Sequence, residues 1–242
     1  MVERAVVLAA GRGTRLGSIT RTVPKPLIEI GGRPLLVRIL DGLSAAGVER
    51  IVVVAGYLAD TIVAALADRP RVDVVVQTEL DGTAGAVRLA ANAMGGHPFV
   101  YAWGDILIRP DNYRRVVSAA AGADAVIGVN WVDDPAAGAA VTVDLEWRVT
   151  GIVEKPSPGT SATNWNSAGI GVLGSEVWPL ITALDPSPRG EYELTDAMAG
   201  LVASGRKVLA VPIEGPWVDI GTPESLARGR ELIRLWEPGS PP

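Results

Sequence analysis

The stretch from residue 11 to residue 25 spaces small residues and cations in a way that suits several phosphates. Glycines stand at 11, 13 and 17, and the cations are Arg12, Arg15, Arg21 and Lys25. Glycine lets a backbone bend tightly and approach a ligand, and successive backbone N–H groups in such a loop bind anions. Four cations exceed what one phosphate needs, so this stretch predicts a polyphosphate site.

Two better-known phosphate loops fit this stretch less well. The dinucleotide fingerprint requires a third glycine that opens a helix, and Leu16 stands at that place. The acidic residue that should follow about 20 positions later falls in the Gly-Gly-Arg turn at 31–33. A Walker A loop needs Gly-Lys followed by Ser or Thr, which the chain lacks. The prolines at 24 and 26 exclude an α-helix over 22–26, and a Gly-rich turn with solvated arginines is the simpler alternative.

Gln77 follows an apolar run at 72–76 and opens a polar stretch that is suited to reading a base. Its amide both donates and accepts hydrogen bonds, and Gly82 would let the backbone approach a ring closely. Ligands of open α/β sheets bind beyond the carboxyl ends of strands, where this stretch should lie. The alternative is a polar strand end followed by a helix that Thr83 caps.

Asp105 and the pair Glu154-Lys155 also follow apolar runs, at 99–103 and 149–153. Mg²⁺ takes one or two carboxylates together with water and phosphate oxygens, so Asp105 is a candidate ligand, with a turn or helix cap as the alternative. Lysine occurs only at 25, 155 and 207, and the first two stand beside prolines. Glu154 and Lys155 reach one ligand only if the strand ends there, which Pro156 favours.

The elements that would position these residues alternate along the chain. Apolar runs at 5–10, 51–55, 72–76 and 99–103 predict buried strands, while the patterns at 34–46 and 58–66 predict helices. This alternation predicts an α/β fold with a mostly parallel sheet and helices on both faces. Further strands are expected at 126–129 and 149–153. One helix should begin near Thr195 and Asp196 as caps, and another at Thr222-Pro223.

Composition is consistent with one large cytoplasmic domain. The chain has 242 residues, of which 48% are hydrophobic, so it can bury a sizeable core. A net charge of −5 argues against a nucleic-acid partner, and no apolar run is long enough for a membrane span. The absence of cysteine removes disulfides and a thiol nucleophile. We expect a single domain over 1–236, with nucleotide-binding and sugar-binding halves of about 1–110 and 111–236, and a frayed tail at 237–242.

The segments LAAGRGTRL at 8–16 and PKPLIEI at 24–30 resemble the opening of the sugar-1-phosphate nucleotidyltransferases. The resemblance extends through further motifs to Thr222. It implies a Rossmann-like, GT-A-like fold with a mixed, mostly parallel sheet. It also implies a reaction in which an NTP and a sugar 1-phosphate give an NDP-sugar and pyrophosphate by Mg²⁺-assisted in-line displacement.

The resemblance further implies which residues act. Those that would bind the nucleotide are Leu8, Ala10, Gly11, Gly13, Thr14, Arg15, Gln77, Gly82 and Thr83. Those that would bind the sugar phosphate are Gly138, Glu154, Lys155, Asn166, Gly169 and Glu191. Catalysis would fall to Arg15, Lys25, Asp105 and Lys155, and Mg²⁺ to Asp105 and Asp219. The chain departs from the family at Ala137, where an aromatic residue is common, so part of the sugar wall differs.

Several alternatives stay open at this level. The spacing of Gln77, Gly82 and Thr83 resembles enzymes that use UTP or dTTP, while GTP or CTP is the alternative donor. A catalytically inactive regulatory subunit and a nicotinamide-dependent oxidoreductase are the other classes. The sequence does not select the sugar, the pathway, an allosteric effector or the oligomeric state, and it leaves a homo-oligomer open.

Overall fold

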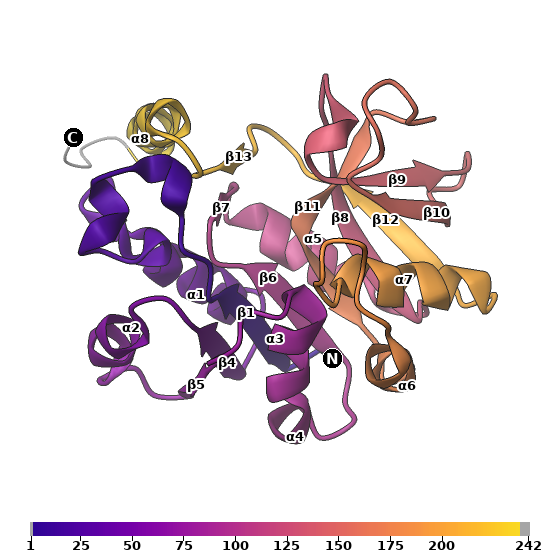
Figure 1. Ribbon diagram of the computed structural model, residues 1–242, viewed down its shortest axis with the longest axis horizontal. Helices are drawn as coiled ribbons and strands as arrows, with labels where there is room; N and C mark the ends of the chain where they lie inside the picture. Colours follow the sequence, from indigo (N-terminus) through magenta and orange to yellow (C-terminus); the bar gives the residue numbers. More distant parts are fainter. Residues whose placement is uncertain (1, 238–242) are drawn as a thin grey trace.

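A nine-stranded mixed sheet forms the centre of the structure, a computed structural model that describes residues 2–237. Its strands follow the order β10-β9-β11-β6-β1-β4-β5, with β8 beside β11 and β12 beside β8. Helices cover both faces of the sheet (Figure 1). The expected α/β fold with a mixed central sheet is confirmed.

The strands that the first half contributes to the central sheet are all parallel: β1 (Arg4–Ala9), β4 (Arg50–Ala55), β5 (Val72–Val76) and β6 (Phe99–Trp103). β1 lies between β4 and β6, and its side chains alternate between two apolar cores. Val7 enters one core and Val6 enters the other. Burial on both faces explains why this run is continuously apolar.

The strands of the second half pair mainly antiparallel. They are β8 (Ala125–Trp131), β9 (Ala139–Val143), β10 (Val149–Glu154), β11 (Trp165–Leu173) and β12 (Val208–Pro212). β11 runs antiparallel to β6, β8 and β9, β10 runs antiparallel to β9, and only β12 is parallel to its neighbour β8. The parallel pairing expected for most of the sheet is thus limited to the first half and the β8–β12 pair, because a hairpin such as β9–β10 reverses the chain.

Each helix contributes apolar side chains to one of the two cores. One core contains α1 (Leu35–Ala45), α2 (Ala59–Leu66), α5 (Asp111–Ala119) and α8 (Pro223–Trp236). The other contains α3 (Thr83–Leu89), α4 (Ala91–Met94), α6 (Val177–Ala183) and α7 (Leu194–Ala203). The expected N-cap of α8 is confirmed, since Thr222 Oγ1 accepts a hydrogen bond from Ser225 N at 3.2 Å and Pro223 is the first helical residue.

The other capping predictions are wrong. Thr83 is the first residue of α3, and Gly82 occupies the N-cap position. Glu193 precedes α7, so Thr195 and Asp196 lie inside its first turn. The prolines around Lys25 exclude an α-helix as expected, but they permit one 3₁₀ turn, η3 (Lys25–Leu27), because Pro26 falls in the first turn where its missing N–H costs nothing.

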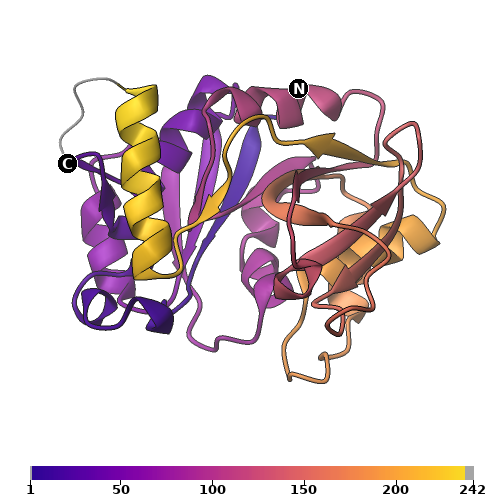
Figure 2. The same ribbon diagram turned by 90° about the horizontal axis from the view of Figure 1, so that it is seen from above.

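The end of the described chain returns to the first half of the molecule. β13 (Val218–Asp219) pairs with β7 (Ile106–Leu107), and α8 then packs near β2 (Glu29–Ile30) (Figure 2). Glu237, expected in a frayed tail, instead accepts a hydrogen bond from Arg38 Nη1 at 2.7 Å, while 238–242 lie outside the described residues. No helix within 2–237 is long and apolar enough to cross a membrane.

Candidate active site

Four charged side chains meet beyond the carboxyl ends of β1 and β6, and we call Arg15, Lys25, Asp105 and Asp219 the phosphate cluster. The strand order β5-β4-β1-β6 reverses direction at β1, and ligands of such sheets bind in the crevice at this reversal. Lys25 Nζ donates to Asp105 Oδ2 at 2.7 Å and to Asp219 Oδ1 at 2.8 Å. The structure therefore brings together Lys25, Asp105 and Asp219, which are far apart in the sequence.

A short antiparallel ladder holds the two carboxylates together. Asp105 lies between β6 and β7 and directly precedes Ile106, and Asp219 is the last residue of β13. In the β7–β13 pair Asp219 lies opposite Ile106, and Ile220 N donates to Asp105 O at 2.9 Å. Each of these strands has two residues, which is too short to leave a periodic signal in the sequence.

Lys25 is almost completely buried, with 7% of its surface exposed. Gly13 packs against its aliphatic stem, and a Cβ at position 13 would lie 3.0 Å from Lys25 Cβ. Burial by itself lowers the pKa of Lys25, but Asp105 and Asp219 outweigh that effect and leave the pKa raised. For Asp105 burial acts in the other direction and raises the pKa, and the charge of Lys25 opposes that rise. Lys25 is therefore a fixed cation whose position depends on both carboxylates.

The remaining cations of the glycine loop lie at its surface. Arg15 Nη2 is 3.4 Å from Asp219 Oδ2 and its side chain is exposed, as are Arg12 and Arg21. The loop continues into single 3₁₀ turns, η1 (Thr14–Leu16) and η2 (Ile19–Arg21), so no α-helix follows the glycines. A dinucleotide site needs that helix, because its N-terminus binds the pyrophosphate.

The residues around the start of the loop approach the ends of β4 and β6. Leu8 O accepts from Gly104 N at 2.8 Å, and Ala10 O accepts from Tyr57 N at 3.0 Å. Gly11 and Thr14 are exposed. The end of β1 and the start of the loop are thus hydrogen-bonded to the segments that follow β4 and β6.

That segment, residues 77–84, is called the base segment here. Gln77 is 6% exposed, and its Nε2 donates to Asp81 Oδ1 at 2.8 Å and to Gly82 O at 3.3 Å. A carboxylate and a carbonyl only accept hydrogen bonds, so these contacts fix which way the amide points. Gln77 Nε2 is thus engaged within the base segment, and Oε1 is the acceptor atom of the amide.

Gly82 adopts a conformation that only glycine adopts readily, because its φ is +110°. A Cβ at this position would lie 2.5 Å from Tyr192 O. The glycine thus lets the base segment pack against a loop of the second half. Thr83 faces the same loop, since its Oγ1 accepts from Leu194 N at 2.9 Å.

Glu154 and Lys155 lie where β10 ends, as expected. The backbone of Lys155 turns into the left-handed region, with φ of +42°, and this turn brings Lys155 Nζ within 3.8 Å of Glu154 Oε1. Thr195 Oγ1 donates to Glu154 Oε2 at 2.9 Å, and Arg189 Nη2 lies 3.4 Å from Glu154 Oε1. The left-handed backbone of Lys155 is strained for a residue other than glycine, and strain of this kind is typical of functional sites. We call Glu154, Lys155, Arg189, Glu193 and Thr195 the sugar cluster.

The ladder registers separate two residues that the sequence placed in one sugar site. Glu154 lies opposite Ala139, whereas Asn166 lies opposite Ala140. Neighbours along a strand face opposite sides of a sheet, so Asn166 points to the face away from Glu154. Ser167, which is buried, faces the Glu154 side and was not assigned from the sequence. Alternation along β11 could have found it, had the register been known.

Of the other residues expected to bind the sugar, two glycines pack against side chains and one glutamate is exposed. Gly138 packs against Asn166, because a Cβ there would lie 2.8 Å from Asn166 Nδ2. Gly169 packs against the ring of Trp103, which a Cβ at this position would overlap. Glu191 is exposed, and it is Glu193 that accepts from Arg189 and lies in the sugar cluster. The sequence missed Arg189 because an arginine in a polar loop has no distinctive pattern.

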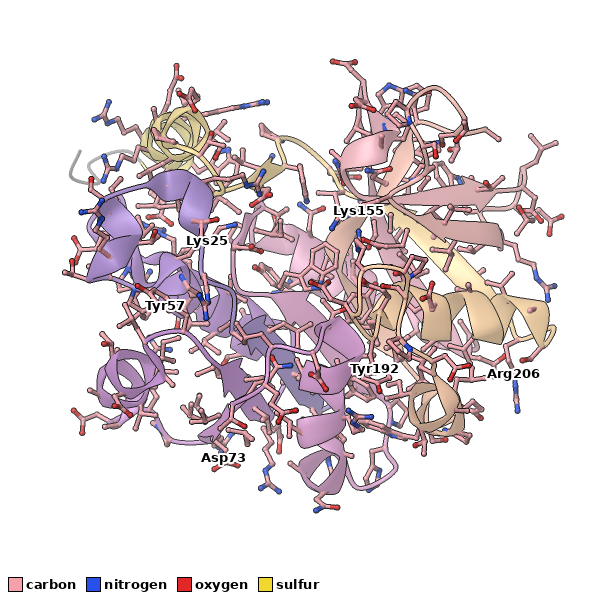
Figure 3. The ribbon with its side chains drawn as sticks, viewed as in Figure 1. Lys25, Tyr57, Asp73, Lys155, Tyr192 and Arg206 are labelled. Carbon is pink, nitrogen blue, oxygen red and sulfur yellow. The ribbon has the colours of Figure 1, made fainter. Side chains whose placement is uncertain are left out.

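Figure 3 places Lys25 on the first half and Lys155 on the second. The donor set of the phosphate cluster fits Mg²⁺, because two carboxylates are held close together by their shared contact with Lys25 Nζ and hard oxygen ligands suit that ion. Within 2–237, no group of three or more His, Cys, Asp or Glu residues could hold a metal ion. Two carboxylates would leave most coordination positions to water and phosphate oxygens, which is how Mg²⁺ is usually held beside nucleotides.

Known proteins have sequences similar to this one over most of its length. The chain is 33% identical over 224 residues to the bifunctional protein GlmU of Methanococcus maripaludis, covering 90% of this chain and 51% of that protein. It therefore spans about half the length of the GlmU relatives. It is 33% identical over 242 residues to the UTP–glucose-1-phosphate uridylyltransferase AglF of Haloferax volcanii, covering 96% of each chain.

The fold comparison agrees with the sequence comparison. A Bacillus anthracis structure described as a glucose-1-phosphate thymidylyltransferase superposes with a TM-score of 0.86 at 26% identity, covering 96% of this chain and 95% of that one. The family described as Nucleotidyl transferase matches residues 4–234, which include both clusters and the base segment. The chain belongs to the Nucleotidyl transferase family.

Proposed function

We propose that the protein transfers a nucleotidyl group from UTP or dTTP to a sugar 1-phosphate and releases pyrophosphate. The observation that carries this proposal is the convergence of Arg15, Lys25, Asp105 and Asp219 at the switch point of the sheet. The base segment belongs to the first half of the molecule and the sugar cluster to the second half. Relatives named as glucose-1-phosphate uridylyl- and thymidylyltransferases support the same reaction.

The proposed reaction is an in-line displacement without a covalent enzyme intermediate. A phosphate oxygen of the sugar 1-phosphate forms a bond to the α-phosphorus, and the bond from that phosphorus to the β-phosphate oxygen breaks. Lys25 offsets the charge of the transferring phosphoryl group, and Arg15 with the loop N–H groups holds the leaving pyrophosphate. Lys155 orients the attacking phosphate. Catalysis then comes from positioning and charge stabilisation.

Asp105 and Asp219 would hold Mg²⁺ beside Lys25, since Lys25 Nζ bonds both carboxylates and keeps them close together. When bound, the ion would offset negative charge on the phosphate oxygens. The protein's contribution is to hold two carboxylates and one ammonium in fixed positions. The β7–β13 ladder and the Ile220–Asp105 hydrogen bond supply that rigidity.

Orientation of the Gln77 amide supports a uracil or thymine base. The carbonyl of Gly82 already accepts from Gln77 Nε2 and from Ala86 N. Gln77 Oε1 is the remaining acceptor, and it suits the N3–H of uracil or thymine. Cytosine and adenine present a bare ring nitrogen in the corresponding place. An unpaired buried acceptor costs about 1–3 kcal/mol, which gives roughly tenfold to hundredfold selectivity.

A pyrophosphate-release screen tests the reaction and the base together. We expect UTP or dTTP to be turned over with at least one sugar 1-phosphate, with kcat/KM at least about tenfold above that for CTP or ATP. Glucose 1-phosphate is the first acceptor to test, because the relatives above are named for it. Turnover with CTP as the preferred donor would contradict the role of Gln77, and turnover with GTP as the preferred donor would contradict the proposed uracil or thymine base. No turnover with any pair would favour an inactive subunit instead.

Lys155 should act on the sugar phosphate rather than on the chemical step. We expect Lys155→Ala to raise KM for the sugar phosphate about tenfold or more while kcat changes little, because a charge-assisted contact is lost in ground and transition states alike. Lys155→Gly should raise that KM equally but unfold at a higher temperature than Lys155→Ala, since φ is +42°. Lys207→Ala, at an exposed lysine, is the matched control. An unchanged KM in both Lys155 variants would remove this residue from the site.

A further inference from the structure

The hydroxyl of Thr83 caps a helix that belongs to the other half of the molecule. Leu194 is the first residue of α7, and its N–H donates to Thr83 Oγ1 at 2.9 Å across 111 positions of sequence. The residue at the N-cap position of α7, Glu193, makes no side-chain capping bond of its own. The first N–H groups of a helix have no partner inside the helix, so an acceptor from another element replaces the usual cap.

The turn that Thr83 holds also holds the carboxylate of Glu154. Thr195 follows Leu194, is 3% exposed, and donates its hydroxyl to Glu154 Oε2 at 2.9 Å. Glu193 precedes Leu194 and accepts from Arg189, which also bonds Glu154 Oε1. A shift of this turn would therefore move both groups that contact the Glu154 carboxylate.

The base segment is attached to the same loop by its main chain. Tyr192 N donates to Asp81 O at 2.7 Å, and Ala84 N donates to Tyr192 O at 2.8 Å. Figure 3 shows Tyr192 beside α3, which begins at Thr83. Asp81 also accepts from Gln77 Nε2 through its side chain. Direct hydrogen bonds and chain neighbours thus connect Gln77, through Thr83 and Thr195, to Glu154.

We propose that Thr83 is a positioning residue that couples the two substrate sites. Its hydroxyl holds the first turn of α7, and through Thr195 that turn holds Glu154 in place for the acceptor sugar. A base bound at Gln77 restrains the segment that carries Thr83, so the nucleotide strengthens binding of the sugar phosphate, and the reverse follows by linkage. The identity of the two ligands rests on the proposed function, whereas the coupling rests on the contacts alone.

Substitution of Thr83 separates this role from a contact with the nucleotide. Thr83→Val keeps the shape and removes the acceptor, and Thr83→Ser keeps the hydroxyl. We expect Thr83→Val to raise KM for the sugar phosphate about fivefold, with a smaller change in KM for the triphosphate, and Thr83→Ser to restore both. Thr182→Val removes a hydroxyl that bonds Trp178 O on α6, outside this network, and should change neither KM. A rise confined to the KM for the triphosphate would overturn the proposal.

A double substitution tests whether the effect passes through Thr195. If it does, Thr83→Val combined with Thr195→Val should raise KM for the sugar phosphate little more than either change alone. Independent effects would instead multiply, and that outcome would overturn the coupling.

Amide hydrogen exchange over 190–199 reads the coupling without turnover, so it stays informative even if no pyrophosphate is released. We expect exchange there to be about fivefold faster in Thr83→Val than in Thr83→Ser in the free protein. Saturating triphosphate should slow it in the wild type and in Thr83→Ser, but not in Thr83→Val. Equal rates in the two free variants would overturn the proposal. So would triphosphate protection that is the same in Thr83→Val as in the wild type.

Discussion

Replacing Lys25 by methionine or alanine should lower kcat about a hundredfold to a thousandfold, the largest effect expected for any single side chain here. Lys25 Nζ lies between Asp105 and Asp219, so the substitution removes the cation beside the transferring group and leaves two carboxylates facing each other. Methionine fills nearly the same volume as lysine and carries no charge. Steady-state kinetics at saturating triphosphate and sugar phosphate measure the effect directly.

The unfolding temperature provides the second readout for Lys25. Loss of the shared cation should also destabilise the fold, and Lys25→Met combined with Asp105→Asn should regain part of that stability, because the repulsion between carboxylates is removed. Lys207→Met is the matched control, since this lysine is exposed. A Lys25→Met enzyme with kcat within tenfold of the wild type would contradict the proposed role.

Asp105→Asn and Asp219→Asn should each lower turnover about a hundredfold while leaving the fold intact. The amide keeps the shape of the carboxylate and loses the charge that holds a hard cation. Lys25 keeps one carboxylate partner in each variant, so the unfolding temperature should change little. Both variants should also need more Mg²⁺ for half-maximal activity.

Asp73→Asn supplies the control for these two variants. Asp73 pairs with Arg50 at the surface, and Figure 3 shows it on the first half of the molecule away from Lys25. Its substitution should leave both the turnover and the Mg²⁺ requirement unchanged. Near-normal turnover of Asp105→Asn or Asp219→Asn would show that the carboxylates are not the metal ligands.

Local patterns in the sequence predicted the parts of the site that depend on neighbouring residues. The run of glycines and cations, the strand before Asp105 and the end of β10 at Glu154 are all visible in short windows, and the structure has these strands where they were expected. The family finding also removes the nicotinamide-dependent oxidoreductase as an alternative. The roles of the individual residues remain predictions.

Features that depend on strand register or on contacts between distant residues could not be predicted. Asn166 and Ser167 are adjacent in sequence, and only the pairing of β11 with β9 shows which of them shares a face with Glu154. Thr83 looked like a cap for its own helix, and it caps α7 instead. The sequence likewise left the Gln77 amide free to flip, whereas the Asp81 carboxylate fixes its direction.

The path of the chain around the phosphate cluster has a consequence for biosynthesis. Lys25 and Asp219 are 194 positions apart, and Asp219 arrives with β13 just before α8, whose Leu226 and Ile233 complete one core. A growing chain on the ribosome presents Lys25 with Asp105 alone, since closing so long a loop must wait for the last elements. We therefore expect nascent chains to bind triphosphates through the glycine loop but not to turn them over. Turnover is expected only after synthesis has passed α8.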